Sequence, residues 1–137
     1  MDLPTVNLVL VNGCFDPFHY GHLVHFEAAR EYGDRLVVSV TRDANVNKGP
    51  RRPVFRESQR ARVIQALRCV DDVILVGSSL EALKRIRPNY FVKGAEYVGK
   101  IQPEDIEFCN RCGIRIVFTH GETYSSTQLL RHDSRRR

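Results

Sequence analysis

Five short aliphatic runs recur along the chain, and a segment with helical character separates each run from the next. The runs lie within the segments VNLVLVNG, RLVVSVTRD, DDVILVG, NYFVKG and IRIVFTHG. Continuous apolar runs are typical of strands buried on both faces, and strands that alternate with helices build parallel sheets. The sequence therefore predicts an α/β protein, a single Rossmann-like domain whose parallel five-stranded sheet carries helices on both faces.

The segments between these runs carry helix start and stop signals. HLVHFEAAREYGD reads as a helix that Gly33 ends, and QPEDIEFCNRCG as a helix that begins near Pro103 and ends at Gly113. SSLEALKRIRP opens with Ser78 and Glu81 in the spacing of a capping box. RESQRARVIQALRCV and SSTQLLRH are expected to form the remaining helices.

The length and the apolar content limit the class of protein. At 137 residues the chain is expected to form one domain, with a core over residues 6–131 and a basic, disordered tail over 132–137. No apolar run approaches the roughly 20 residues that span a membrane, and the N-terminus lacks the basic start of a secretory signal. We expect a cytoplasmic protein that does not bind a membrane.

The chain is basic, with 21 Lys and Arg against 16 Asp and Glu and a net charge of +5. Part of the excess lies in the tail, and part lies in a cluster formed by Arg51, Arg52, Arg56, Arg60 and Arg62. A face that binds single-stranded nucleic acid would carry several aromatic residues among its basic ones, or a recognisable module, and Phe55 is the single aromatic residue between Arg51 and Arg62. We therefore expect no nucleic-acid partner, and the internal cluster could face an anionic ligand.

The sequence contains four cysteines, of which Cys109 and Cys112 form a C-x-x-C pair. A second pair or a histidine pair at zinc-site spacing is missing. We expect free thiols and no protein-bound metal site.

Polar residues follow the predicted strands at their carboxyl ends, where parallel sheets bind ligands. The residues that follow the first strand are Asn12, Gly13, Cys14, Asp16, His19 and His22; those after the later strands are Asp43, Lys48, Lys93, Gly94, Glu96, Gly121, Glu122, Ser125, Ser126 and Thr127. The sequence thus predicts one polar rim that holds the functional site.

His19 and His22 lie at the entry of the first predicted helix, next to Gly13. A helix N-terminus attracts phosphate through its free N–H groups and its dipole, and two imidazoles would add side-chain donors. This arrangement suits a polyphosphate that gains charge during displacement. Metal binding and an ordinary surface position are the alternatives for the two histidines.

The stretch GCFDPFHYGH resembles the G-x-F-D-x-x-H-x-G-H signature of the cytidylyltransferase-like nucleotidyltransferases. The resemblance continues, in order, through the KGPRRPV loop, SQR, VKGAEY and SST, from about Asn7 to Leu130. These motifs are most similar to those of glycero-manno-heptose 1-phosphate adenylyltransferases. Glycerol-3-phosphate cytidylyltransferases, which carry R-T-x-G-I-S-T-T where this chain has THGETYSST, resemble it less.

The resemblance implies transfer of AMP from ATP to a sugar 1-phosphate, a glycero-manno-heptose 1-phosphate in particular, with release of pyrophosphate. Magnesium is expected to accompany the triphosphate, held mainly by phosphate oxygens and water. The resemblance also implies a homodimer.

The resemblance assigns roles to individual residues. His19 and His22 are expected to stabilise charge on the α-phosphate and on the leaving group, and Lys48 to close on the phosphates from its loop. The other nucleotide-binding candidates are Asn12, Gly13, Cys14, Phe15, Lys93, Gly94, Ser125, Ser126 and Thr127. The candidates for the acceptor substrate are Asp43, Arg60 and Glu96.

Some of these residues have a structural alternative. Lys48 could be a solvated loop lysine, Ser126 and Thr127 could cap a helix, and Arg60 could brace its loop. Asp16 is expected to brace the histidine loop, and His25 to be structural.

Three other functions are open. The same chemistry could use CTP and glycerol 3-phosphate or another polyol phosphate. The chain could bind a nucleotide without catalysis, although the presence of His19, His22 and Lys48 argues against this. It could bind RNA, because class I aminoacyl-tRNA synthetases carry a similar His-x-Gly-His turn, but it is short and lacks a tRNA-binding appendage.

Overall fold

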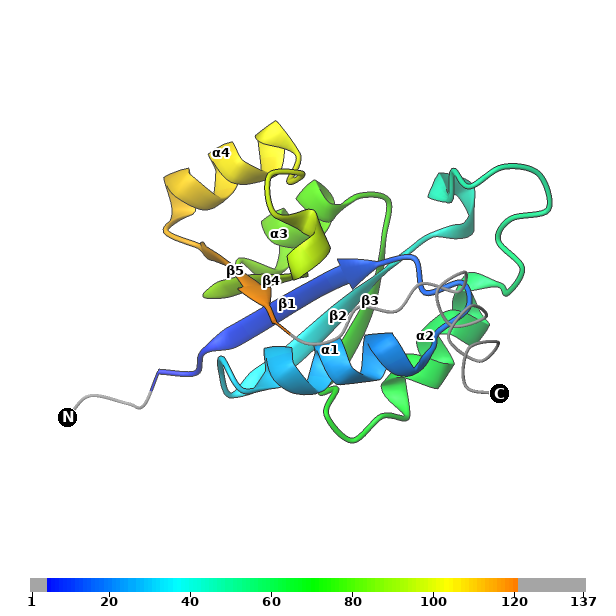
Figure 1. Cartoon of the computed structure of the whole chain (residues 1–137), viewed down its shortest axis with the longest axis horizontal. Helices are drawn as coiled ribbons and strands as arrows, with labels where there is room; N and C mark the ends of the chain where they lie inside the picture. Colours follow the sequence, from blue (N-terminus) through cyan, green and yellow to red (C-terminus); the bar gives the residue numbers. More distant parts are fainter. Residues whose placement is uncertain (1–4, 121–137) are drawn as a thin grey trace, which may run out of the picture.

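The computed structural model describes residues 5–120, which form a five-stranded sheet with helices on both faces (Figure 1). The strands are β1 (Leu8–Gly13), β2 (Arg35–Thr41), β3 (Asp72–Val76), β4 (Tyr90–Gly94) and β5 (Arg115–Thr119). The helices are α1 (Tyr20–Arg30), α2 (Glu57–Gln65), α3 (Ser79–Ile86) and α4 (Pro103–Cys112), with short 3-10 turns at Asp43–Asn45 and Ala95–Tyr97. The predicted fold class is confirmed.

The strand order is β3-β2-β1-β4-β5, and every neighbouring pair is parallel. The chain moves from β1 outward to β2 and β3, and then returns to the other side of β1 to add β4 and β5. The order reverses between β1 and β4. A crevice forms at the carboxyl ends of strands at such a reversal, because the connections leave in opposite directions.

Two apolar layers lie on the two faces of the sheet. Val9 and Val11 of β1 pack toward α1 and α2 with Phe26 and Ile64, whereas Leu10 packs toward α3 and α4 with Leu83. Figure 1 shows the two pairs of helices on opposite sides of the sheet. Because successive strand residues point to opposite faces, a continuous apolar run serves both layers.

The ends of the helices match the sequence signals in part. Gly113 adopts a left-handed φ of 72° as the C-cap of α4, and Ser78 accepts the N–H of Glu81 as the N-cap of α3. The Glu81 carboxylate accepts the N–H of Gly77 instead of completing a capping box with Ser78. The prediction for Gly33 was wrong, because α1 ends at Arg30.

Gly33 has a different structural reason. A Cβ at this position would lie 2.6 Å from the carbonyl oxygen of Asn7 and 2.8 Å from a methyl carbon of Val9. Glycine therefore allows the chain to pass close to the start of β1.

Two further predictions concern sequence features outside the site. The four cysteines carry free thiols, and no helix within residues 5–120 has the length and apolarity needed to cross a membrane. The predicted closing helix SSTQLLRH lies outside the described residues.

Candidate active site

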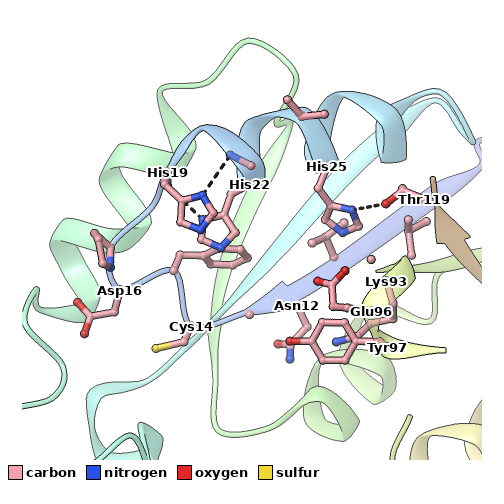
Figure 2. A pocket seen from close by; sticks show the side chains of 18 of the residues that line it. Asn12, Cys14, Asp16, His19, His22, His25, Lys93, Glu96, Tyr97 and Thr119 are labelled. Carbon is pink, nitrogen blue, oxygen red and sulfur yellow. Dashed lines mark hydrogen bonds between the residues drawn. The ribbon is translucent and has the colours of Figure 1, made fainter. Parts of the chain in front are cut away.

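A cavity of about 490 Å³ opens at the carboxyl ends of β1 and β4, where the strand order reverses (Figure 2). It is lined by Val11, Asn12, Gly13, Cys14, Phe15, Asp16, Pro17, His19, Gly21, His22, Val24, His25, Lys48, Arg52, Val92, Lys93, Gly94, Glu96, Tyr97 and Thr119. The lining includes side chains from β1, α1, the loop after β2, β4 and β5. The cavity thus brings together rim residues that follow β1, β2 and β4, although Asp43 of the predicted rim does not line it.

His19 and His22 begin α1 as a reciprocal cap. His19 is the N-cap residue, and its Nδ1 accepts the N–H of Gly21 at 3.1 Å; Nδ1 of His22 accepts the N–H of His19 at 3.1 Å. The first N–H groups of a helix have no partner within the helix, and these two imidazoles satisfy two orphan backbone donors. The rings stack with their centroids 3.8 Å apart.

This capping determines the tautomer of both rings. An Nδ1 atom that accepts a hydrogen bond carries no proton, so the proton of each neutral ring is on Nε2. Burial, followed by the positive charges of His19, His25 and Lys48, lowers the pKa of His22 to about 3. Burial also lowers the pKa of His19. Near pH 7 the site thus holds two neutral rings whose free edge is an Nε2–H donor.

The end of β1 forms the floor of the cavity. The Asn12 Oδ1 atom accepts the hydroxyl of Ser39 at 2.6 Å, and within residues 5–120 the amide NH₂ of Asn12 is left for a ligand. Gly13 leaves space for an aromatic ring, because a Cβ there would lie 2.7 Å from the Phe15 ring. Phe15 in turn contacts the His22 ring edge-on, with centroids 5.0 Å apart, and helps to hold that ring in position.

Asp16 connects the histidine loop to the loop between β2 and α2. Its buried carboxylate accepts the N–H groups of Val54 and Phe55 at 2.7 and 2.9 Å and the Nε–H of Arg52 at 2.9 Å. Burial alone would raise the pKa of Asp16, but these donors lower it below its ordinary value. Asp16 therefore has the bracing role that the sequence predicts, and it braces both loops.

The opposite end of the cavity carries Lys93, Glu96 and Tyr97 (Figure 2). The Lys93 ammonium lies 4.1 Å from the centroid of the Tyr97 ring, and burial lowers its pKa although Asp105 and Glu96 oppose the shift. A Cβ at Gly94 would lie 2.5 Å from a carboxylate oxygen of Glu96. Glycine at this position therefore lets the Glu96 carboxylate fold back over the end of β4.

The family is shown by comparison with known proteins. A family model described as cytidylyltransferase-like matches residues 10–131. The chain belongs to the cytidylyltransferase-like family. It is therefore a nucleotidyltransferase domain by family, and the two stacked histidines, the strand end and the Asp16 loop lie within the matched residues.

Curated relatives of this cytidylyltransferase-like domain include two bifunctional proteins named HldE. The HldE of Gluconobacter oxydans is 49% identical over 129 residues, which are 90% of this chain and 27% of that protein. The HldE of Methylobacillus flagellatus is 47% identical over 94 residues, which are 66% of this chain and 19% of that protein. The chain thus spans about a fifth to a quarter of the length of these relatives.

Solved structures agree with the fold. A lipopolysaccharide core biosynthesis protein from Thermoplasma volcanium has a TM-score of 0.72 at 28% identity, over 88% of this chain and all of that one. A bifunctional NMN adenylyltransferase/ADP-ribose pyrophosphatase from Francisella tularensis has a TM-score of 0.62 at 14% identity, over 94% of this chain and 42% of that one. The second likeness concerns the fold alone.

The structure collects most of the predicted site residues of this family member around the cavity. Those that line it are Asn12, Gly13, Cys14, Phe15, His19, His22, Lys48, Lys93, Gly94 and Glu96. Ser125, Ser126 and Thr127 lie outside the described residues.

Arg60 and Asp43 are not among the residues that line this cavity, and their predicted contact with the acceptor stays a prediction. Arg60 is 2% exposed, and its guanidinium donates to the carbonyl oxygens of Phe55, Cys14 and Thr41. Its Nη2 also contacts the Asp43 carboxylate at 2.6 Å. Because these bonds occupy the arginine within the protein, the structure favours the bracing alternative for Arg60 and pairs Asp43 with it.

Four polar residues that line the cavity were not among the predicted site residues, namely His25, Arg52, Tyr97 and Thr119. Arg52 belongs to the arginine cluster that the sequence suggested could face an anionic ligand. His25 lies one turn after His22 on the same helix face, and this spacing was an available signal. Its Nδ1 lies 2.9 Å from the Thr119 hydroxyl, which joins α1 to the end of β5. Burial lowers the pKa of His25. Tyr97 is the last residue of the VKGAEY motif, whereas Thr119 carried no comparable local signal.

Proposed function

We propose that this domain transfers AMP from ATP to a sugar 1-phosphate, D-glycero-D-manno-heptose 1-phosphate, and releases pyrophosphate and an ADP-sugar. The observation that carries the proposal is the pair of neutral imidazoles at the start of α1, whose Nδ1 atoms are occupied by backbone donors. Their Nε2–H groups are left as fixed donors beside Lys48 in one cavity.

The proposed reaction needs positioning and charge stabilisation. An oxygen of the acceptor phosphate attacks the α-phosphorus of ATP, and the bond from that phosphorus to the leaving pyrophosphate breaks. A phosphate monoester is already anionic near pH 7, so its attack needs no strong base. His19, His22 and Lys48 would donate to the oxygens that gain negative charge, and donors fixed before the reaction need no reorganisation.

The two ends of the cavity differ in the groups that they offer, and this difference supports a sugar phosphate as acceptor. His19, His22 and Lys48 provide donors for phosphates, whereas Glu96, beside Lys93, provides carboxylate oxygens at the opposite end. Carboxylates accept hydrogen bonds from hydroxyl groups and repel phosphates. We assign the acceptor hydroxyls to the Glu96 end.

The choice of ATP and a heptose phosphate rests on similarity. The motifs KGPRRPV, VKGAEY and SST resemble those of glycero-manno-heptose 1-phosphate adenylyltransferases. A curated relative is 49% identical over 129 residues, and one similar structure is that of a lipopolysaccharide core biosynthesis protein.

We also propose that magnesium enters with the triphosphate and neutralises part of its charge. Within residues 5–120, no three His, Cys, Asp or Glu side chains gather closely enough to hold a metal ion. Of the two carboxylates that line the cavity, Asp16 is already bonded to Arg52, Val54 and Phe55. This donor set fits an ion coordinated mainly by phosphate oxygens and water.

The test is pyrophosphate release in the presence of magnesium. ATP, CTP, GTP and UTP are each offered with heptose 1-phosphates, hexose 1-phosphates and glycerol 3-phosphate. We expect release with ATP and a heptose 1-phosphate. Release with CTP and glycerol 3-phosphate alone would keep the mechanism and replace both substrates.

A second outcome separates catalysis from binding. Saturable binding of triphosphate without pyrophosphate release from any pair would contradict the enzymatic proposal and favour a nucleotide-binding module.

A further inference from the structure

Arg52 is placed on the cavity wall by a fixed contact on one edge of its guanidinium. Its Nε donates to the Asp16 carboxylate at 2.9 Å, and its Nη2 donates to the Asp16 carbonyl oxygen. The side chain of Asp16 is 0% exposed and that of Arg52 is 30% exposed. The arginine is therefore anchored at a buried carboxylate but still reaches the cavity.

The anchor does not use all donors of the guanidinium. Arginine has five N–H groups in a planar fork, of which two are used here. Among residues 5–120, the other three have no acceptor. The Asp16 carboxylate already accepts three N–H groups, those of Arg52 Nε, Val54 and Phe55.

The neighbours of Arg52 in the cavity add donors. His19, His22 and Lys48 line the same end, and the carboxylate at this end, that of Asp16, already accepts three N–H groups. A ligand that satisfies this end must bring several acceptor oxygens and negative charge, as a phosphate group does.

We propose that Arg52 is a phosphate-binding residue of this site, held in position by Asp16, and that its free guanidinium edge contacts anionic oxygens of the substrates. The inference deepens the proposed function and rests on it. The phosphate can belong to the nucleoside triphosphate or to the sugar 1-phosphate, and both present the same chemistry to the arginine.

The anchor has a physical advantage for binding. An arginine side chain without an anchor loses rotamer freedom when it binds a ligand, and this entropy loss weakens binding. Asp16 orders the side chain before the ligand arrives. A guanidinium can do this because its planar fork offers one edge to the carboxylate and another to the ligand, whereas an ammonium acts as a point charge.

The test compares Arg52→Gln with Arg51→Gln. Both variants remove one positive charge from the same loop, but Arg51 is exposed and does not line the cavity among the described residues. Calorimetric titrations with inorganic pyrophosphate, Mg–ATP and mannose 1-phosphate measure binding to the whole chain, and thermal unfolding reports its stability. Arg52→Lys keeps the charge and loses the fork.

We expect Arg52→Gln to weaken binding of at least one probe about 10- to 100-fold, as for loss of charge-assisted hydrogen bonds. We expect Arg51→Gln to change each affinity less than about twofold, since a solvated charge is screened. Arg52→Lys should recover only part of the loss. A loss confined to pyrophosphate and Mg–ATP assigns Arg52 to the triphosphate, and one confined to mannose 1-phosphate assigns it to the acceptor.

Other outcomes overturn the inference. Equal affinities of folded Arg52→Gln and Arg51→Gln for all three probes would show that Arg52 only braces the loop, while the proposed function stands. If Arg52→Gln does not fold, unimpaired pyrophosphate binding by folded Arg52→Lys overturns the inference, and a weakened affinity supports it.

The experiment also separates the inference from the proposed function. If phosphate binding depends on Arg52 but the native protein releases no pyrophosphate, the result supports the phosphate-binding role of Arg52 and contradicts the proposed function. Absence of binding to all probes by the native chain would contradict both.

Discussion

The backbone N–H of His19 donates to Nδ1 of His22 at 3.1 Å, and the two imidazole rings stack with centroids 3.8 Å apart. One edge of each ring thus caps helix α1, and the other edge is left as an Nε2–H donor. Helix capping and ligand binding use opposite edges of the same side chains, so substitutions can separate the two roles.

His19→Asn should abolish most activity and preserve the fold. Asparagine is a favourable N-cap residue and can accept the N–H of Gly21, but it lacks the Nε2–H donor. We expect turnover to fall about 100- to 1,000-fold, as for removal of one transition-state donor. The thermal midpoint should change little. His19→Ala, which loses both edges, should show the same loss of turnover and an additional loss of about 1 kcal/mol in stability.

The tautomer of His22 should persist into acid. Because its pKa is lowered from 6.5 to about 3, the ring stays neutral, with Nε2 protonated and Nδ1 bare, at pH 5. Long-range ¹H–¹⁵N spectra of the imidazole nitrogens measure this directly. Equal ¹⁵N shifts of the two nitrogens at pH 5, as in an imidazolium, would contradict the capping geometry.

The same lowered pKa predicts how stability depends on pH. Between pH 6.5 and about 3 the unfolded chain holds more protons on this residue than the folded chain. The free energy of unfolding therefore falls as the pH falls, by at most about 1.4 kcal/mol per pH unit from one such group. Urea unfolding of native protein and of His22→Asn isolates the contribution, and the variant should show the shallower slope between pH 6 and 4.

Asp16→Asn should destabilise the protein strongly. The substitution places an NH₂ group against the N–H of Val54 or Phe55 and removes the charge that pairs with Arg52. The variant would bury a donor without an acceptor and break the ion pair with Arg52. We therefore expect the free energy of unfolding to fall by about 3 kcal/mol, measured by urea unfolding. Asp34→Asn is the matched control, because exposed Asp34 also accepts a backbone N–H, that of Asn7, and should cost less than about 1 kcal/mol.

Ser39→Ala should lower kcat/KM, because it removes the hydrogen bond that orients Asn12. Fully buried Ser39 donates to Asn12 Oδ1 at 2.6 Å and so orients the Asn12 amide toward the cavity. Without this bond the amide can rotate, and we expect kcat/KM to fall about fivefold with a stability loss of about 1 kcal/mol. Ser39→Cys, which keeps a weak donor, should lie between the two proteins. An unchanged kcat/KM in Ser39→Ala would show that the amide orientation is unimportant.

Gly94→Ala should weaken binding of the acceptor without destabilising the fold. The three atoms nearest to the added methyl group all belong to the end of the flexible Glu96 side chain, the first at 2.5 Å, so we expect the carboxylate to move and the backbone to stay in place. We expect the KM for the sugar phosphate to rise about tenfold, the KM for ATP to stay within about twofold, and the fold to persist. Steady-state kinetics with each substrate varied in turn measures both constants.

Gly33→Ala provides the contrast to Gly94→Ala. Its methyl group would meet a backbone carbonyl oxygen at 2.6 Å, which cannot move aside cheaply. This variant should lose more than about 1 kcal/mol of stability. Loss of stability in Gly94→Ala, or an unchanged KM for the acceptor, would remove the role given to the Glu96 carboxylate.

The sequence alone determined the sheet and the place of the site. Uninterrupted runs such as VNLVLVNG and RLVVSVTRD predict strands buried on both faces, because the alternation of strand side chains exposes every residue to an apolar layer. The helix signals at Ser78, Pro103 and Gly113 are also local, because a cap depends on residues at its own end of the helix. His19 and His22 could be placed at a helix entry because their position depends on only a few neighbouring residues.

Only the tertiary structure decided which polar residues reach the cavity. Arg60 and Asp43 face each other, 17 residues apart in sequence, and are used within the protein. Arg52 is anchored 36 residues away at Asp16, and His25 meets Thr119 across 94 residues. The periodicity of a sequence indicates the face of a helix or strand on which a side chain lies. It does not indicate which group pairs with a charged or polar side chain that is removed from water. That partner is set by strand order and loop path, which bring distant segments together.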